Sequence, residues 1–262
     1  MSILSRKQST ENDAWLETLA KISSIVSREE IDALTNKTIS EIQSMVGNKK
    51  SAYAWSGGKD SIVLGHICER MEICDSMIGI CDLEYPAFLS WIAENQPKNC
   101  TVINTHQNLD WLCTYPKMLF PQNSAIAGHW FSIVQHRAQQ NYFKANQLDI
   151  LLLGRRHADG NFVGRGSNIY TDGKGITRYS PLSNWSHEHI LAYLHYHQLP
   201  LPPVYGWKNG YLCGTHPWPA RQWTGDIENG WREIYSIDST IVTTAAQKIE
   251  SAYDFLNKEV RV

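Results

Sequence analysis

The sequence predicts an α/β protein with a doubly wound, mostly parallel sheet, and three observations lead to this expectation. From residue 51 onwards, short apolar runs alternate with stretches of helical periodicity, as in parallel strands joined by helices. One run, residues 148–154, is apolar on both faces, which is typical of a central parallel strand. Residues 56–61 join the first run directly to the first helix through a glycine pair, a turn common at the ligand edge of such sheets.

Composition limits the classes of function. A chain of 262 residues that is 42% hydrophobic can bury a substantial core, and a net charge of −2 does not indicate nucleic-acid binding. The first ten residues contain no apolar signal region and no 18-residue apolar run exists, so we expect a cytoplasmic protein without a membrane segment. Six irregularly spaced cysteines, without a Cys-x-x-Cys pair, lead us to expect no disulfide framework, structural zinc or iron–sulfur cluster.

Residues 1–48 are predicted to form an N-terminal helical segment. Apolar residues recur at helical spacing from Trp15 to Ile25, and the patterns at 27–30 and 38–41 each fit a capping box that would start a new helix. The central nucleotide-binding domain is expected at 49–225.

The turn at residues 56–61 is a candidate anion-binding loop. If residues 52–55 form a buried strand and 60–70 a helix, the backbone N–H groups of the turn point towards a bound anion. Gly57 and Gly58 permit positive φ angles and close approach of the ligand.

The side chains of this turn suit a phosphate. Ser56 and Ser61 can donate hydrogen bonds to phosphate oxygens, Lys59 adds a cation, and Asp60 can accept Mg²⁺ or the loop's own backbone N–H groups. A Walker A loop is excluded, because it requires Ser or Thr after the lysine and a glycine where this chain has Tyr53.

These residues resemble the PP-loop, Ser-Gly-Gly-x-Asp-Ser, of the ATP pyrophosphatase superfamily, and all five specified positions match. The resemblance implies the adenine nucleotide alpha-hydrolase-like fold, binding of the pyrophosphate end of ATP, and cleavage between the α- and β-phosphates. An ordinary strand-to-helix turn is the alternative interpretation.

The second predicted strand, residues 76–82, ends in Asp82, which places Asp82 and Glu84 beside the nucleotide. The stretch resembles the Asp-Thr-Gly-x-x-x-Pro of sulfonucleotide reductases and the ATP sulfurylase subunit, although only the Asp and an approximate Pro86 match. A turn capped by the Asp is equally compatible with the sequence. The next predicted elements are a helix at 86–95, a strand at 100–104, an irregular loop at 105–128 and a helix at 129–147.

Gly154, Arg155 and Arg156 follow the strand at 148–154, and two guanidinium groups at a strand's carboxyl end suit a polyanion. The same superfamily branch carries a Gly-x-Arg-Arg-like segment here, which implies contact with phosphates or a substrate sulfate. A solvated surface pair is the alternative. Residues 164–178 extend a basic, glycine-rich loop that we expect to close over the anion.

The segment 179–205 also resembles that branch, through the order Pro-Leu-x-x-Trp, amphipathic helix, Leu-Pro. A helix opens at Ser186. His187 and His189 face different sides of it and no carboxylate lies at ligand spacing, so surface histidines are favoured over a metal site.

Cys213 begins a Cys-Gly-Thr-His stretch similar to the end of the catalytic Glu-Cys-Gly-x-His of sulfonucleotide reductases, but Leu212 replaces the Glu. A second register compares the segment with a Gly-Tyr-x-x-x-Gly stretch of the same family, followed by Arg221 and Trp223. We prefer this register, in which Cys213 is a packing residue and no later cysteine supplies the reductase nucleophile.

Residues 226–262 are predicted as a C-terminal helical segment, with an amphipathic helix at 238–258 that docks on the domain or on a second subunit. We therefore expect a PAPS reductase-like PP-loop enzyme that binds ATP with Mg²⁺ and transfers the adenylyl group to an unknown acceptor, releasing pyrophosphate. Charge would be neutralised by Arg155 and Arg156, without a protein nucleophile. The alternatives are a thiol-dependent sulfonucleotide reductase that uses Cys213, and a non-catalytic nucleotide-binding subunit.

Overall fold

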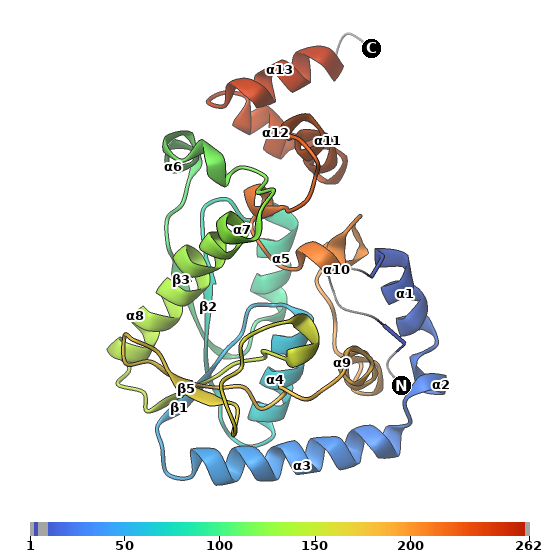
Figure 1. Ribbon diagram of the computed structural model, residues 1–262, viewed down its shortest axis with the longest axis vertical. Helices are drawn as coiled ribbons and strands as arrows, with labels where there is room; N and C mark the ends of the chain where they lie inside the picture. The colour runs from blue at the N-terminus through green and yellow to red at the C-terminus, as the bar shows by residue number, and fades with distance from the viewer. Residues whose placement is uncertain (1–2, 5–9, 260–262) are drawn as a thin grey trace.

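A mostly parallel sheet of six strands, in the order β3-β2-β1-β4-β6-β5, forms the centre of the described part of the chain (Figure 1). The computed structural model describes residues 3–4 and 10–259. The strands are β1 (Ser51–Ala54), β2 (Asp75–Ile80), β3 (Asn99–Asn104), β4 (Ile150–Leu152), β5 (Ile169–Thr171) and β6 (Thr177–Tyr179). The pairings from β3 through β6 are parallel, and β5 pairs with β6 in the antiparallel direction.

Helices cover both faces of this sheet, which confirms the doubly wound α/β class (Figure 1). The α-helices of the described chain are α1 (Asn12–Ala20), α2 (Ile22–Ile25), α3 (Arg28–Val46), α4 (Lys59–Glu69), α5 (Pro86–Asn95), α6 (Leu109–Thr114), α7 (Ser124–Phe131), α8 (Arg137–Ala145), α9 (His187–Tyr196), α10 (Gly210–Cys213), α11 (Ile227–Ile237), α12 (Ser239–Ala245) and α13 (Glu250–Glu259). Short 3₁₀ turns are η2 (Pro116–Met118), η4 (His157–Asp159), η5 (Pro203–Gly206) and η6 (Trp218–Ala220), and η3 (Ser132–His136) is π-helical.

Strand β1 separates two hydrophobic cores because its side chains alternate between the two faces. Tyr53 belongs to the larger core, which includes residues of α4, α5 and α9. Ala52 and Ala54 belong to the smaller core, beneath α8. All three side chains are buried, so β1 has the double-sided burial of a central parallel strand.

Most elements of the domain predicted at 49–225 lie within two residues of their predicted bounds. The helix at 86–95 and the helix start after Ser186 are confirmed. The predicted run 148–154 contains β4, which is three residues long and completely buried.

The segment from residue 105 to 147 differs from the prediction. The stretch 105–128 is not wholly irregular, because Asn108 caps α6 and Asn123 caps α7, each accepting a hydrogen bond from a backbone N–H three residues on. The helix predicted at 129–147 begins five residues earlier, at Ser124, and contains the π-helical turn η3.

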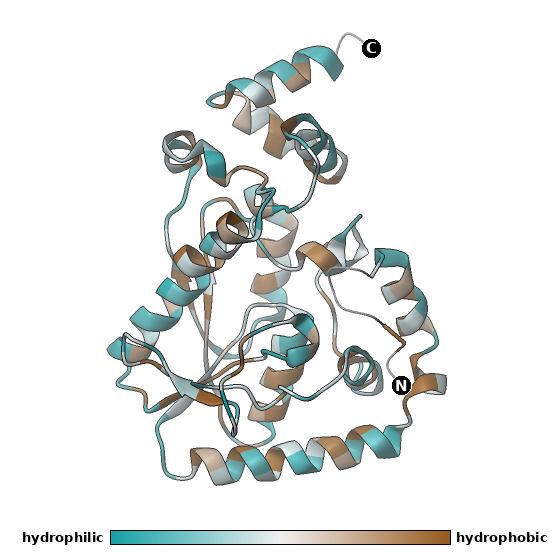
Figure 2. Ribbon diagram, in the orientation of Figure 1, coloured by the Kyte–Doolittle hydropathy of each residue, from teal (hydrophilic) through white to brown (hydrophobic). Residues whose placement is uncertain are grey.

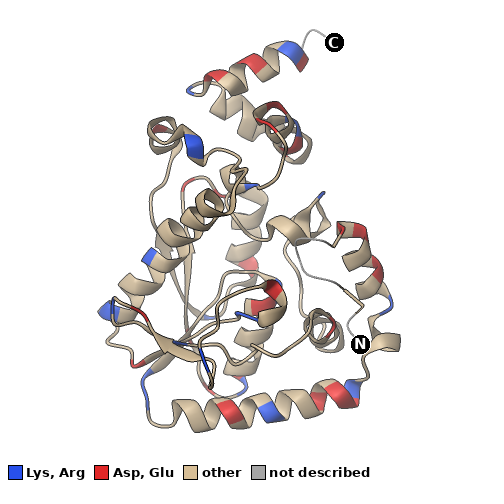
Figure 3. Ribbon diagram, viewed as in Figure 1, with Lys and Arg blue, Asp and Glu red and all other residues tan. Residues whose placement is uncertain are grey.

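The N-terminal helices surround one side of the sheet domain. Ser27 accepts a hydrogen bond from the Glu30 N–H and starts α3, as predicted. The start predicted at Thr38 is wrong, because its hydroxyl donates to the Leu34 carbonyl within the same helix. Along α3, hydrophobic and hydrophilic positions alternate and both signs of charge occur (Figures 2 and 3).

Two further expectations need correction. Residues 164–178 do not form an open basic loop over an anion: they contain the hairpin β5-β6, in which Arg178 is buried and paired with Asp172. The helix predicted at 238–258 is interrupted at 246–249 and forms α12 and α13, with α11 preceding them.

The predicted end segments also include residues 1–2, 5–9 and 260–262, which lie outside the described residues. Of the helices described, none combines the length and apolar character needed to span a membrane.

Candidate functional site

The candidate site lies where the strand order changes direction, between the carboxyl ends of β1 and β4. In doubly wound sheets this switch point forms the ligand crevice. The loops that follow these two strands touch closely, because a methyl group added to Gly154 would lie 2.9 Å from the carbonyl carbon of Asp60. A cavity of about 310 Å³ lies here, and both loops contribute to its wall.

The PP-loop, residues 56–61, supplies one side of this cavity. The Ser61 hydroxyl accepts a hydrogen bond from the Ser56 N–H at 3.0 Å and donates one to the Gly58 carbonyl at 2.9 Å. The Ser56 hydroxyl donates to the Ser61 hydroxyl at 3.2 Å. Gly57 has a φ of +66°, and an added Cβ would lie 2.9 Å from the Phe88 ring. Ser61 therefore closes the loop by hydrogen bonds, and the Phe88 ring packs against the loop at Gly57.

Lys59 and Arg156 lie behind this loop in a buried cluster of charges. Lys59 Nζ lies 2.6 Å from Asp60 Oδ2 and 3.8 Å from Asp159 Oδ1. Arg156 Nε lies 2.7 Å from Asp60 Oδ1, and its Nη2 lies 2.9 Å from Asp159 Oδ2. Lys59 and Arg156 are buried residues, at most 2% exposed, whereas Asp60 and Asp159 also line the cavity. The two buried cations thus act on the cavity through the two carboxylates.

Arg156 also fixes His187. Its guanidinium donates to the Trp185 carbonyl and to His187 Nδ1. Burial, followed by the charge of Arg156, lowers the pKa of His187 to about 4. The expectation of a surface histidine is therefore wrong for His187, which is 2% exposed. His189 is partly exposed and accepts the Ser186 N–H in a capping box.

Arg155 lies in the cavity wall, in contrast to its neighbour. Its Nη2 donates to His136 Nε2 at 2.6 Å, its Nη1 donates to the Tyr170 hydroxyl at 3.0 Å, and its guanidinium carbon lies 5.2 Å from the centre of the Phe131 ring. Burial and the charge of Arg155 lower the pKa of His136 to about 4, so His136 is neutral and accepts this hydrogen bond. The charge of Arg155 has no carboxylate partner among the residues described and is available to an anion.

Asp82 and Glu84 lie at the end of β2, outside the lining of this cavity. Asp82 accepts a hydrogen bond from Asn104 and is exposed beside His106. Glu84 is buried, accepts the Cys81 N–H at 3.2 Å, and has a pKa that burial raises to about 8.

Cys213 is 4% exposed at the end of α10 and does not line the cavity, although Leu212 and Gly214 on either side do. Its packing position agrees with the second of the two registers. The same segment contributes a group that sequence reasoning missed: Thr215 donates to the Ser56 carbonyl at 3.0 Å. The position belongs to the Cys-Gly-Thr-His stretch, but spacing alone does not reveal a contact between residues so distant in the chain.

A magnesium ion does not fit directly on Asp60 in this arrangement. Each carboxylate oxygen lies within 2.7 Å of a cationic nitrogen, so a metal would have to displace Lys59 or Arg156. Within residues 3–4 and 10–259, no group of three or more His, Cys, Asp and Glu residues has a metal-binding arrangement.

A PP-loop between the first strand and helix of a doubly wound sheet defines a protein of the adenine nucleotide alpha-hydrolase-like class. Residues 50–213 match the model of the phosphoadenosine phosphosulfate reductase domain, and the chain belongs to that family.

Three solved structures are similar to this chain at low sequence identity. A phosphoadenylyl-sulfate (PAPS) reductase from Candida auris in a phosphate complex is 16% identical over 70% of this chain and 94% of that chain, with a TM-score of 0.49. NMN synthetase from Francisella tularensis is 15% identical over 87% and 93%, with a TM-score of 0.47. NH3-dependent NAD synthetase from Campylobacter jejuni, in complex with nitrate, is 15% identical over 87% and 92%, with a TM-score of 0.45. A search of curated proteins gave no match.

Proposed function

We propose that this protein binds ATP in the cavity at the carboxyl ends of β1 and β4 and transfers its adenylyl group to an acceptor. The observation that carries the proposal is the convergence of Ser56, Ser61 and Arg155 on one cavity of about 310 Å³. The glycine-rich backbone and the Arg155 guanidinium offer donors for phosphate oxygens, Ser61 holds the loop in shape, and the Ser56 hydroxyl can turn from Ser61 towards a bound phosphate.

In the proposed reaction, an oxygen or nitrogen nucleophile of the acceptor forms a bond to the α-phosphorus while the bond to the bridging oxygen breaks. Pyrophosphate leaves and takes the electron pair of that bond. The loop from Ser56 to Ser61 holds the leaving pyrophosphate, Arg155 neutralises charge in the transition state, and Gly154 allows the two loops to approach. Magnesium, when bound to the triphosphate, would supply further charge neutralisation.

Lys59, Asp60 and Arg156 have an indirect role in this proposal. Because Asp60 is held by both cations, it keeps the first turn of α4 in place and presents a neutralised carboxylate to the nucleotide. A free carboxylate at this position would repel the phosphates. These three residues are therefore positioning residues.

A sulfonucleotide reductase is the first alternative. Such an enzyme requires an accessible thiolate as nucleophile, and Cys213 is buried with its neighbours in the cavity wall. This observation favours adenylyl transfer over thiol chemistry. A non-catalytic subunit that retains nucleotide binding is the second alternative.

The test uses ATP, adenylyl sulfate and phosphoadenylyl sulfate as separate ligands of the full chain. Calorimetry measures binding, and product analysis measures pyrophosphate, AMP, ADP and sulfite. We expect ATP to bind and Ser61→Ala to weaken it at least roughly tenfold, through loss of the hydroxyl that closes the loop. Ser40→Ala, at an exposed serine of α3, is the matched control. Sulfite formation that Cys213→Ser abolishes would replace this proposal with the reductase.

A further inference from the structure

A second and larger cavity, of about 600 Å³, lies between α4 and the turn that joins α5 to β3. It shares no lining residue with the cavity of the PP-loop. Its wall includes Cys74, just before β2, and Asn99, at the start of β3, so it opens towards the amino ends of these strands. Its volume is in the range of small-molecule sites.

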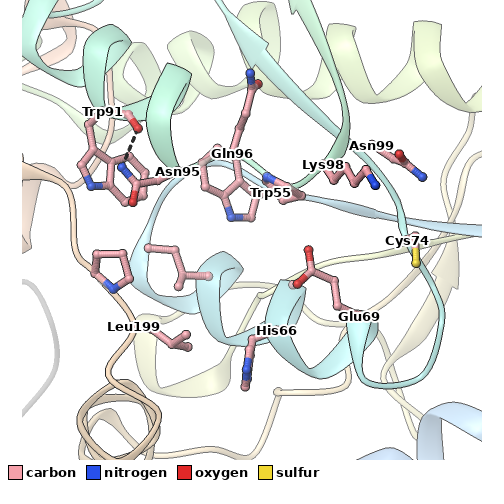
Figure 4. A pocket seen from close by; sticks show the side chains of 14 residues that line it. Trp55, His66, Glu69, Cys74, Trp91, Asn95, Gln96, Lys98, Asn99 and Leu199 are labelled. Carbon is pink, nitrogen blue, oxygen red and sulfur yellow. Dashed lines mark hydrogen bonds between the residues drawn. The ribbon is translucent and has the colours of Figure 1, made fainter.

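Two opposite charges face this space from opposite walls. Glu69 rises from α4, and Lys98 extends from the turn across from it (Figure 4). The Glu69 carboxylate accepts a hydrogen bond from the Tyr53 hydroxyl at 3.3 Å. Across the described ranges, neither Glu69 nor Lys98 takes part in an ion pair within 4.0 Å, with each other or with another residue. The gap between them can therefore admit a ligand that pairs with both.

The wall between these charges is aromatic and apolar. Trp55 and Trp91 stack with their ring centres 5.7 Å apart and their planes 8° from parallel. Ile62 and Leu199 complete the apolar lining.

Trp55 adds a second observation that points to a ligand. Trp55 is only 3% exposed, and it lines the cavity. No acceptor in the described part of the chain pairs with its indole N–H. Trp55 lines the cavity, so this donor can serve an acceptor on a bound molecule.

We propose that this cavity binds a free amino acid with an aromatic or large aliphatic side chain. Its ammonium group pairs with Glu69, its carboxylate pairs with Lys98, and its side chain packs against Trp91, Ile62 and Leu199. The indole N–H of Trp55 donates to the same carboxylate. The site is separate from nucleotide binding and does not depend on the function proposed above.

The test is a binding titration of the full chain, by calorimetry and ligand-observed NMR, with L-phenylalanine and L-leucine as probes. We expect saturable binding of at least one probe at a single site. Phenethylamine lacks the carboxylate and 3-phenylpropionate lacks the ammonium, so each should bind at least roughly tenfold more weakly than L-phenylalanine.

Variants assign the site. Glu69→Gln and Lys98→Met should each weaken binding at least roughly tenfold. Glu94→Gln and Lys49→Met, at exposed residues outside the cavity lining, should bind as the parent chain does. Thermal denaturation, measured in parallel, should show a cooperative transition in Glu69→Gln and Lys98→Met and so report a folded chain.

Three results would overturn the proposal. One is absence of saturation by either probe at concentrations up to about 10 mM. Another is equal binding by the parent chain and both Glu69→Gln and Lys98→Met. The third is a monomer–dimer equilibrium that these two substitutions shift while no probe binds, because the cavity would then be a contact between two copies of the chain.

Discussion

Arg155 and Arg156 are adjacent in sequence but have different surroundings. Arg155 lies in the cavity wall over Phe131, whereas Arg156 is 0% exposed in the cluster with Asp60 and Asp159. Successive side chains of an extended segment point to opposite sides. The sequence therefore predicted that this segment borders the crevice but could not decide which arginine faces the cavity.

Replacement of Arg155 tests its contact with phosphate. We expect Arg155→Ala to weaken nucleotide affinity or slow pyrophosphate release by roughly 10²-fold, because a charged, bidentate donor is removed. Arg155→Lys should recover only part of this loss, since an ammonium lacks the planar fork. Calorimetry and a pyrophosphate assay provide the measurements. Values for the alanine variant within about twofold of the parent chain, or less than ~0.5 kcal/mol, would exclude a direct contact.

Replacement of Arg156 should act first on stability. Arg156→Ala leaves Asp60 and Asp159 with Lys59 as the remaining cation of the cluster. Removing one partner of a buried ion pair typically destabilises a protein by about 3–5 kcal/mol. Urea denaturation measures this loss, with Arg155→Ala as the adjacent control. An unchanged denaturation midpoint in Arg156→Ala would show that the buried cluster contributes little to folding.

Glu84 predicts a pH dependence of stability. Burial raises its pKa from 4.5 to about 8. Between these values the unfolded chain has released the proton while the folded chain retains it, so the free energy of unfolding falls as pH rises through this window. Glu84→Gln removes this contribution and should gain stability relative to the parent chain between pH 5 and pH 8. His136 and His187 titrate in both proteins and cancel in the comparison. A constant difference in urea midpoint would contradict the raised pKa.

At the scale of elements, local signals determined most of what could be predicted. Four helices begin where local sequence features indicate. Serines cap α3 and α9, a proline opens α5, and the apolar run that leads into the PP-loop precedes α4. The hairpin β5-β6 was missed because its strands have three residues each and its Arg178 resembles an anion ligand. Its ion pair with Asp172 forms only after the hairpin closes.

Gly57 offers a test of how the PP-loop is supported. Gly57→Ala introduces a side chain at a φ of +66°, which costs about 1–2 kcal/mol, and it places a methyl group 2.9 Å from the Phe88 ring. Gly175→Ala is the matched control, because its φ is +78° and nothing lies within 4 Å of an added Cβ. Both variants should lose stability, but only Gly57→Ala should also lose nucleotide affinity. Equal affinity in the two variants would show that the support from Phe88 is dispensable.

At the scale of the whole molecule, the helical segments at both ends of the described chain pack closely against the sheet domain. Trp15 of α1 stacks on Tyr211, with ring centres 4.8 Å apart, and lies 5.5 Å from Lys59 Nζ in the buried charge cluster. Helical periodicity indicated that Trp15 faces a core. It could not indicate which core, because contacts between residues so far apart in sequence depend on the complete fold.

The C-terminal helices are joined to the sheet domain by a buried ion pair. Arg221 is 3% exposed, pairs with Glu233 of α11, and donates to the Lys208 carbonyl and the Tyr85 hydroxyl. A nearby pair on the same helix, Glu228 with Arg232, is exposed. Glu228 and Glu233 are therefore the same residue type on the same helix, α11, but only Glu233 is buried in its ion pair.

Glu233→Gln should destabilise the junction between the C-terminal helices and the sheet domain. The change leaves the Arg221 guanidinium buried without its carboxylate, and losses of about 3–5 kcal/mol are typical of such broken pairs. Glu228→Gln changes the same residue type on α11 but removes only solvent-screened contacts, so its unfolding should match that of the parent chain. Thermal denaturation measures global stability, and limited proteolysis between α10 and α11 measures local opening of the junction. If Glu233→Gln and Glu228→Gln unfold at the same temperature and resist protease equally, the ion pair of Arg221 does not hold the C-terminal helices in place. Apolar contacts such as that of Phe120 with Trp231 would then stabilise the junction instead.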